Sequence, residues 1–341
     1  MVEILKRLTE ARGVTGNEND VRQIIIELTS QLDDEVFVDK IGNVIVKKKG
    51  KQGQVNKKIM LDAHMDEVGF IISSISDNGM LKFRLVGSID PRILVSKRVL
   101  IGKNAVPGVI GIKAIHLQEP DERNNAVQQK QMYIDIGVKS KDEAEKVVKL
   151  GDYAAFDSRF IFFGDNKVKA KSLDDRVGCG VLIELLKDSY DCDIYACFSV
   201  QEEIGMRGSE VAAYHINPDL ALVIEGTTCA DIPDVPEHIQ TTRLGMGPAI
   251  SFMDHSSIAN KNIYNGLIKT AKDHSIPFQI KENVSGSNDA GSIHKSGEGI
   301  ATVVISVPCR YIHSPASVMD LEDYNNTILL MKEFLKGCVT N

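Results

Sequence analysis

Apolar residues recur along the chain with two different periods, and each period predicts its own kind of element. Near the N-terminus they recur at helical spacing, which predicts helices over 2–11 and 18–31. Thr15 and Glu18 have the spacing of a capping box just before the second of these helices. Short apolar runs parted by polar turns then predict strands over 36–39, 44–46 and 58–61.

The middle of the chain is rich in short Ile, Val and Leu runs that alternate with turn signals. Between 70 and 136 these signals include 76–79, 90–91 and 106–108. Such spacing is typical of a small β-barrel or sandwich. One short helix is then expected over 141–150.

After Phe156 the pattern changes to alternating strands and helices, which predicts a sheet covered on both faces. The expected helices span 175–187, 209–214, 258–274 and 321–335, and the expected strands span 193–200, 221–224, 279–282 and 302–307.

The length of 341 residues suggests roughly two domains. Hydrophobic residues make up 43% of the chain and charged residues 26%, as in ordinary globular proteins. Together with the change of pattern, this predicts an α/β domain formed by residues 1–69 and 166–341. A β module of residues 70–165 interrupts it.

The charge balance disfavours two classes of partner. The chain carries 40 Lys and Arg residues against 47 Asp and Glu residues, for a net charge of −7. This sign opposes general attraction to nucleic acid or anionic lipid. The N-terminal residues meet a charge every few positions, and no apolar run is long enough to span a bilayer. We therefore expect a cytoplasmic protein with no nucleic-acid or membrane partner.

All six cysteines lie in the second half of the chain, without a Cys-x-x-Cys pair. The interpretation that fits a reducing cytosol is small buried thiols rather than a disulfide framework. The cysteines are Cys179, Cys192, Cys197, Cys229, Cys309 and Cys338.

Acidic and imidazole side chains follow several of the predicted strands. His64 and Asp66 are two positions apart at a strand end, so their side chains project the same way. In open α/β sheets the ligand crevice lies beyond the carboxyl ends of the strands. The other such residues are Asp174, Glu202, Glu203, Glu225 and His313.

Two histidines with several carboxylates and no cysteine form a ligand set suited to zinc, cobalt or manganese. Two such ions that share one carboxylate can hold a water between them and lower its pKa. The site also needs a base that is not a ligand. Adjacent glutamates such as Glu202 and Glu203 supply one, because consecutive side chains diverge.

Three motifs resemble those of the M42 metallo-aminopeptidases, the group that includes glutamyl and tetrahedral aminopeptidases. They lie at 62–69, 172–179 and 201–205, and the stretches 86–92 and 108–113 are similar to the dimerisation insert of that family. The resemblance implies a zinc-peptidase α/β domain of the phosphorylase/hydrolase-like type, with a mixed sheet flanked by helices. It also implies an inserted small β-barrel or PDZ-like dimerisation domain.

The resemblance also implies a role for each candidate residue. One divalent ion is expected on His64 and Glu225. Many members of the family carry Asp at the position of Glu225. The other ion is expected on Glu203 and His313. Asp174 is expected to bridge the two ions, with a cis peptide bond to Asp175. Asp66 is expected to orient the ring of His64, and Glu202 to act as the general base.

The activity implied is removal of N-terminal residues from short peptides with a free N-terminus, by a metal-bridging water and a glutamate base. Two zinc or cobalt ions per subunit are expected, with manganese as a further option. The family also implies homodimers, which in many members assemble into dodecamers. Three alternatives stay open: another amide hydrolase such as a deacylase or carboxypeptidase, an endoglucanase-type glycosidase, and a non-catalytic assembly protein.

Overall fold

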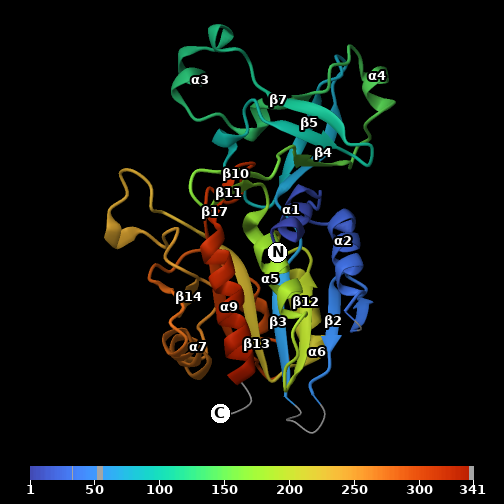
Figure 1. Ribbon diagram of the computed structural model, residues 1–341. Helices are drawn as coiled ribbons and strands as arrows, with labels where there is room; N and C mark the ends of the chain where they lie inside the picture. The colour runs from blue at the N-terminus through green and yellow to red at the C-terminus, as the bar shows by residue number, and fades with distance from the viewer. Residues whose placement is uncertain (33, 52–56, 338–341) are drawn as a thin grey trace.

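A large mixed sheet and a closed β-barrel make up the two main parts of the computed structural model, which describes residues 1–32, 34–51 and 57–337 (Figure 1). Cys338 lies outside the described residues. In Figure 1 the barrel stands at the top, beyond the end of the molecule where β10, β11 and β17 lie.

The elements keep to the predicted pattern with small shifts at their ends. The α-helices of the described residues are α1 (Val2–Glu10), α2 (Asn19–Thr29), α3 (Pro120–Asn124), α4 (Lys141–Glu145), α5 (Leu173–Leu185), α6 (Arg207–Ile216), α7 (Lys261–Asp273), α8 (Ala290–Ile293) and α9 (Leu321–Gly337). The strands of the large sheet are β1 (Glu35–Val38), β2 (Val44–Lys48), β3 (Lys58–His64), β10 (Ile161–Phe163), β11 (Lys167–Ala170), β12 (Asp193–Ser199), β13 (Leu220–Thr228), β14 (Ala249–Ser251), β15 (Gln279–Lys281), β16 (Ala301–Arg310) and β17 (Ser317–Asp320).

The centre of the large sheet is parallel. Its main path runs β1-β2-β12-β3-β13-β16-β17-β11-β10, and β12, β3, β13 and β16 are parallel to one another. In register, His64 lies opposite Ser199 of β12, and Glu225 of β13 lies opposite Ser306 of β16. The carboxyl ends of these four strands therefore meet at one edge of the sheet.

Helices cover both faces of this sheet because side chains alternate along each strand. On β3, Ile59 and Leu61 belong to the core under α1, α5 and α9, whereas Met60 belongs to the core under α6 and α8. Both cores exclude solvent at β3, where Ile59, Met60 and Leu61 are all 0% exposed. The expectation of a mixed sheet flanked by helices is confirmed.

The barrel is built from antiparallel strands in the order β4-β5-β8-β7-β6-β9. Three phenylalanines form its centre. The ring of Phe70 packs edge-on against those of Phe83 and Phe156, with ring centroids 5.2 and 5.1 Å apart. The expected small β-barrel is therefore present. Its strands are β4 (Gly69–Ile75), β5 (Leu81–Val86), β6 (Arg98–Ile101), β7 (Val106–Gly111), β8 (Tyr133–Asp135) and β9 (Tyr153–Phe156).

Some details differ from the expectation. The helix expected over 141–150 ends at Glu145. Thr15 does not cap α2, because Glu18 is its N-cap and the Thr15 hydroxyl donates instead to Asp66 at 2.7 Å. Strand β10, inside the range given to the β module, pairs with β11 in the large sheet. Among the described residues, no helix combines the length and apolar character needed to cross a membrane.

Candidate metal centre

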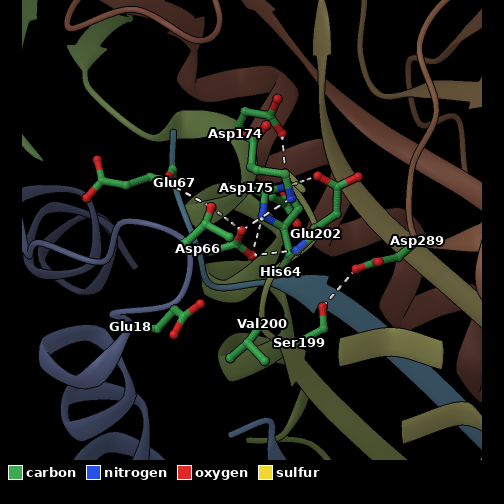
Figure 2. Close-up of polar contacts among 12 residues, drawn as sticks. Glu18, His64, Asp66, Glu67, Asp174, Asp175, Ser199, Val200, Glu202 and Asp289 are labelled. Atoms are coloured by element: carbon green, nitrogen blue, oxygen red, sulfur yellow. Dashed lines mark hydrogen bonds and ion pairs between the residues drawn. The ribbon is translucent and has the colours of Figure 1, made fainter. Parts of the chain in front are cut away.

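Two of the predicted site residues lie at the end of β3, the strand at the middle of the sheet. His64 is the last residue of β3, and both it and Asp66 are buried, at 2% and 0% exposure. Nδ1 of His64 lies 3.5 Å from Oδ1 of Asp66, and Nε2 lies 3.4 Å from Oδ1 of Asp174. The two nitrogens of one ring therefore face different carboxylates, as Figure 2 shows around His64.

The other predicted residues reach the same place from four further elements. Parallel pairing brings the ends of their strands to one edge of the sheet. Asp174 lies in the first turn of α5, Glu202 and Glu203 follow β12, Glu225 lies within β13, and His313 follows β16.

Asp174 lies between the two histidines. Its Oδ1 is 3.4 Å from Nε2 of His64, and its Oδ2 is 3.4 Å from Nε2 of His313. On the first side, Oε2 of Glu225 is 3.7 Å from the same His64 nitrogen. On the second side, Oε1 of Glu203 is 3.4 Å from the His313 nitrogen. Two groups of three ligand atoms, each within 4.8 Å of one another, thus share Asp174.

The chemistry of this donor set fits divalent cations. Oε1 of Glu203 and Oε1 of Glu225 are buried and have no hydrogen-bond partner among the described residues. Buried carboxylate oxygens without a partner are costly, and a cation held at Glu203 would give its Oε1 one. Imidazole and carboxylate donors without thiolate suit zinc, cobalt or manganese.

Asp66 connects His64 to the backbone of Glu202 and Glu203. Its Oδ1 accepts a hydrogen bond from the backbone N–H of Glu202 at 3.0 Å, and its Oδ2 accepts one from that of Glu203 at 3.2 Å. The Thr15 hydroxyl also donates to Oδ2 at 2.7 Å. One buried carboxylate therefore fixes the ring of His64 relative to the backbone of both glutamates.

Glu202 lies beside the two groups of ligand atoms without belonging to either. Its Oε2 is 3.9 Å from Nε2 of His64, and its side chain lines the cavity that both groups face. Burial raises the pKa of Glu202 well above its ordinary value, although His64 opposes this shift. The carboxylate therefore has a strong tendency to take up a proton.

Charge and burial also shift the pKa of the ligand residues. Burial raises the pKa of Glu203 to about 7. For His313, burial disfavours the imidazolium, but the neighbouring Asp174 and Glu203 outweigh it and raise the pKa to about 9. For Asp174, burial favours the neutral acid, but His313 and His64 outweigh it and hold the pKa well below its usual range. The carboxylates around the two histidines thus favour the imidazolium form of both rings.

The local backbone at Asp174 agrees with the expectation from the sequence. Its peptide bond to Asp175 is cis. Ser172, just before it, has a positive φ of 54°. The backbone angles of Asp174 and Asp175 are not helical at this start of α5, and the Asp174 side chain lines the cavity of the site.

The seven predicted residues are grouped around one cavity of about 440 Å³, with Asp66 directly behind His64. Two residues to which the motifs assign no role also line this cavity: Ser88, in the loop that follows β5, and Lys281, at the end of β15. Neither position has a spacing signature, although Lys281 does come shortly before the glycine-containing loop at 285–288.

Comparison with known proteins decides the family. A family model described as M42 glutamyl aminopeptidase matches residues 42–330. The chain belongs to the M42 family. A lysyl aminopeptidase of Pyrococcus furiosus is 31% identical to it over an alignment of 346 positions, which covers 98% of this chain and 96% of the relative. The resemblance drawn from the three motifs is confirmed, and this M42 protein is a peptide hydrolase of the aminopeptidase class.

Solved structures share its fold over nearly the whole length. The TET1 peptidase of Pyrococcus horikoshii, described as assembling into a tetrahedron or a large octahedral shell, has 32% identity and a TM-score of 0.86, with 98% of both chains covered. An endoglucanase from Thermotoga maritima has 38% identity and a TM-score of 0.82, with 98% of this chain and 97% of that chain covered. The M42 fold is therefore shared by proteins described with different activities.

Proposed function

We propose that this M42 protein removes N-terminal residues from short peptides at a centre for two divalent ions. His64 and Glu225 would hold one ion, Glu203 and His313 the other, and Asp174 both. The observation that carries the proposal is the placement of Asp174, whose two oxygens each lie 3.4 Å from a different histidine nitrogen. Zinc and cobalt suit these donors best, with manganese as a third option.

Divalent ions bound there would act as Lewis acids toward a peptide carbonyl and lower the pKa of a nearby water. Glu202 is the residue that moves protons in this scheme. Its carboxylate takes a proton from the attacking water and returns it to the leaving amine, which a raised pKa favours. Asp66 keeps Glu202 in place through the backbone hydrogen bond at 3.0 Å.

Glu225 has a second task in this proposal. Its side chain lines the cavity and is 5% exposed, and Oε1 has no hydrogen-bond partner among the described residues. A carboxylate in this position would accept a hydrogen bond from the free α-amine of the substrate. This contact would select peptides with a free N-terminus over blocked ones.

The substitution Glu202→Gln tests the role of the base. Loss of a general base costs about 10²- to 10⁴-fold in rate, and we expect kcat to fall by that amount while metal content stays at the wild-type level. The exposed Glu210, on α6, offers a matched control because Glu210→Gln removes the same charge outside the ligand groups. Near-normal turnover of Glu202→Gln with both metals bound would show that another group is the base.

Two comparisons separate this proposal from its rivals. An aminopeptidase needs the free amine, so a peptide and its N-acetylated form should differ strongly in rate, whereas a deacylase or carboxypeptidase would accept the blocked form. A glycosidase uses a pair of carboxylates and needs no metal. Sugar hydrolysis that persists after exhaustive chelation would therefore favour the endoglucanase alternative.

We further propose that the chain forms homodimers through the β module and that these assemble into larger particles in the cytoplasm. Support for the assembly comes from the TET1 peptidase of P. horikoshii, which is described as forming closed shells. Support for a reducing compartment comes from Cys179, Cys197, Cys229 and Cys309, which are buried thiols. Light scattering of the purified protein measures the particle mass, and a monomer at all concentrations would refute the assembly.

A further inference from the structure

A second cavity, of about 480 Å³, lies beside the catalytic one and joins it. Gly205 and Met206 line both cavities. Of the described residues, only the chain neighbours of Gly205 come within 4 Å of a Cβ atom built on it, so open space surrounds it where the cavities meet. The rest of the second cavity lies between α6 and the segment 292–297 at the end of α8. We call it the α6 groove, and its volume is usual for a small-ligand site.

One wall of the α6 groove is an exposed face of the helix. Met206, Val211 and Tyr214 line it at helical spacing, beginning at the catalytic cavity. Val211 is 42% exposed and Tyr214 is 78% exposed, so both leave apolar surface open to solvent. From Met206 to Tyr214 the helix rises about 12 Å, at about 1.5 Å per residue. An extended peptide spans about 3.3 Å per residue, so this wall has room for about three to four residues.

The other wall runs in the same direction and carries a cation. At its near end, the Ser292 hydroxyl lies 2.7 Å from that of Ser209, in the first turn of α6. At its far end, a Cβ atom on Gly297 would lie 3.8 Å from Oδ1 of Asn217, the C-cap of α6. Lys295 lines the groove between these two points, beyond the middle of the wall. It is exposed, and its ammonium forms no hydrogen bond or ion pair with the described residues.

The position of the groove indicates which part of a peptide it would hold. The turn that leads into it is fixed to Glu202, whose backbone carbonyl accepts from the N–H groups of Gly205 at 2.8 Å and Met206 at 2.9 Å. Glu202 is the residue that we assign to protonation of the leaving amine, and such a residue must lie within hydrogen-bond reach of that nitrogen. The leaving part of the peptide therefore begins at Glu202 and continues toward the groove.

The charges along the groove suit the far end of that leaving part. Glu210 borders the groove about one helical turn before Tyr214, nearer to the cavity, whereas Lys295 lies farther along. A leaving part of about three residues spans about 10 Å, which carries its α-carboxylate past Glu210 to Lys295. The ammonium of Lys295 supplies the opposite charge there, in a contact that solvent keeps weak.

We propose that the α6 groove binds the leaving part of the substrate and that Lys295 pairs with its C-terminal α-carboxylate. The preferred substrates are then peptides of about four to five residues with a free C-terminus. This proposal rests on the proposed aminopeptidase function and names the substrate class of that same site. Lys295 acts here as a specificity-determining residue. Because it lies away from the reacting bond, it acts on KM rather than on kcat.

Two forms of one tetrapeptide give the sharpest test. Leu-Ala-Ala-Ala and its C-terminal amide differ only in the charge of the last residue. An exposed ion pair predicts that kcat/KM of the wild type is about two- to fivefold higher for the acid than for the amide. We expect Lys295→Met to lower that ratio to about 1, through KM, and Lys295→Glu to invert it. Lys261, exposed on α7 and outside the groove, provides the control, since Lys261→Met should leave the ratio unchanged.

The dipeptide Leu-Ala and its amide show whether the effect depends on position. The carboxylate of the dipeptide ends near the cavity, so Lys295→Met should not change the acid-to-amide ratio of this pair. Equal cleavage of the tetrapeptide acid and amide by the wild type, or one ratio in the wild type and both Lys295 variants, would overturn the proposal.

The substitution Tyr214→Ser tests the other occupant of the groove, a second copy of the chain. We expect it to raise KM for the tetrapeptide and to leave the particle mass unchanged. A changed mass with an unchanged KM would show that a second copy covers the groove, and would overturn the proposal. Failure of the metal-loaded wild type to cleave leucyl p-nitroanilide would instead overturn the aminopeptidase function itself.

Discussion

Replacement of Asp66 by Asn is the most informative perturbation of the centre. Asn keeps the volume of the side chain but replaces one acceptor oxygen with an NH₂ group. Asp66 accepts from the backbone N–H of Glu202 through one oxygen and from Thr15 and the N–H of Glu203 through the other. Whichever way the new amide turns, at least one buried N–H would face a donor rather than an acceptor.

The expected magnitude follows from what is lost. A buried donor left without its acceptor costs about 1–3 kcal/mol of folding free energy. Loss of a carboxylate that orients a metal-binding histidine costs about 10- to 100-fold in metal affinity or activity. Removal of one negative charge also relieves the repulsion that helps to raise the pKa of Glu202 and Glu203, which stabilises the metal-free state. Loss of the orienting carboxylate and loss of the negative charge both weaken metal binding. Metal affinity is therefore a cleaner readout of the substitution than folding stability.

The assay is a titration of metal-free protein with zinc in competition with a chromophoric chelator, together with denaturant unfolding of the same samples. We expect Asp66→Asn to bind zinc about 10- to 100-fold more weakly than the wild type. Thr15→Val is the matched control, because it removes one donor to Asp66 and leaves the charge in place. An affinity of Asp66→Asn within a few-fold of the wild type would refute the view that Asp66 orients His64.

Two further predictions concern stability. Glu67→Gln should lower the free energy of unfolding by about 3–5 kcal/mol, because it strips a buried Lys171 of a carboxylate held at 2.7 Å; an unchanged denaturant midpoint would contradict this. The pKa of His313 is raised to about 9 in the metal-free protein, so its stabilising charge is complete below about pH 6.5 and is lost as the pH rises through 9. Metal-free protein should therefore melt at a lower temperature across this window, while zinc affinity rises because fewer protons compete. The melting temperature of His313→Gln, measured by circular dichroism, should fall less steeply than that of the wild type over this range, and an equal fall would contradict the role given to His313.

Elements with a strong hydrophobic period could be predicted from the sequence to within a few residues. The strand expected over 193–200 is Asp193–Ser199, and the helix expected over 258–274 is Lys261–Asp273. The prediction of a capping box at Thr15 was wrong, because residue spacing alone does not reveal a competing partner elsewhere in the fold. The hydroxyl of Thr15 has the buried Asp66 within reach, and this charged acceptor takes it away from the helix end.

The candidate ligands could be found because each follows a strand or begins a helix at the same edge of the sheet. The pattern of strands and helices alone does not say which ligands face one another, and the expected pairs come from the resemblance to the M42 motifs. The facing of the ligands depends on the order β12-β3-β13-β16, which places His64 between the strands that carry the glutamates. Lys281 escaped notice for a related reason. It ends a strand of three residues, and only the pairing of β15 with β14 brings it toward the cavity.

The insertion of the barrel between β3 and β10 has a physical consequence for the centre. The loop that follows β5 reaches the site at Gly87 and Ser88. A Cβ atom on Gly87 would lie 3.3 Å from the Cβ of Glu203. The backbone of Ser88 helps to raise the pKa of His313. Both contacts involve the ligand group formed by Glu203 and His313, whereas His64 and Glu225 belong to strands of the large sheet itself. A distortion of the barrel should therefore disturb the positions of Glu203 and His313 more than those of His64 and Glu225.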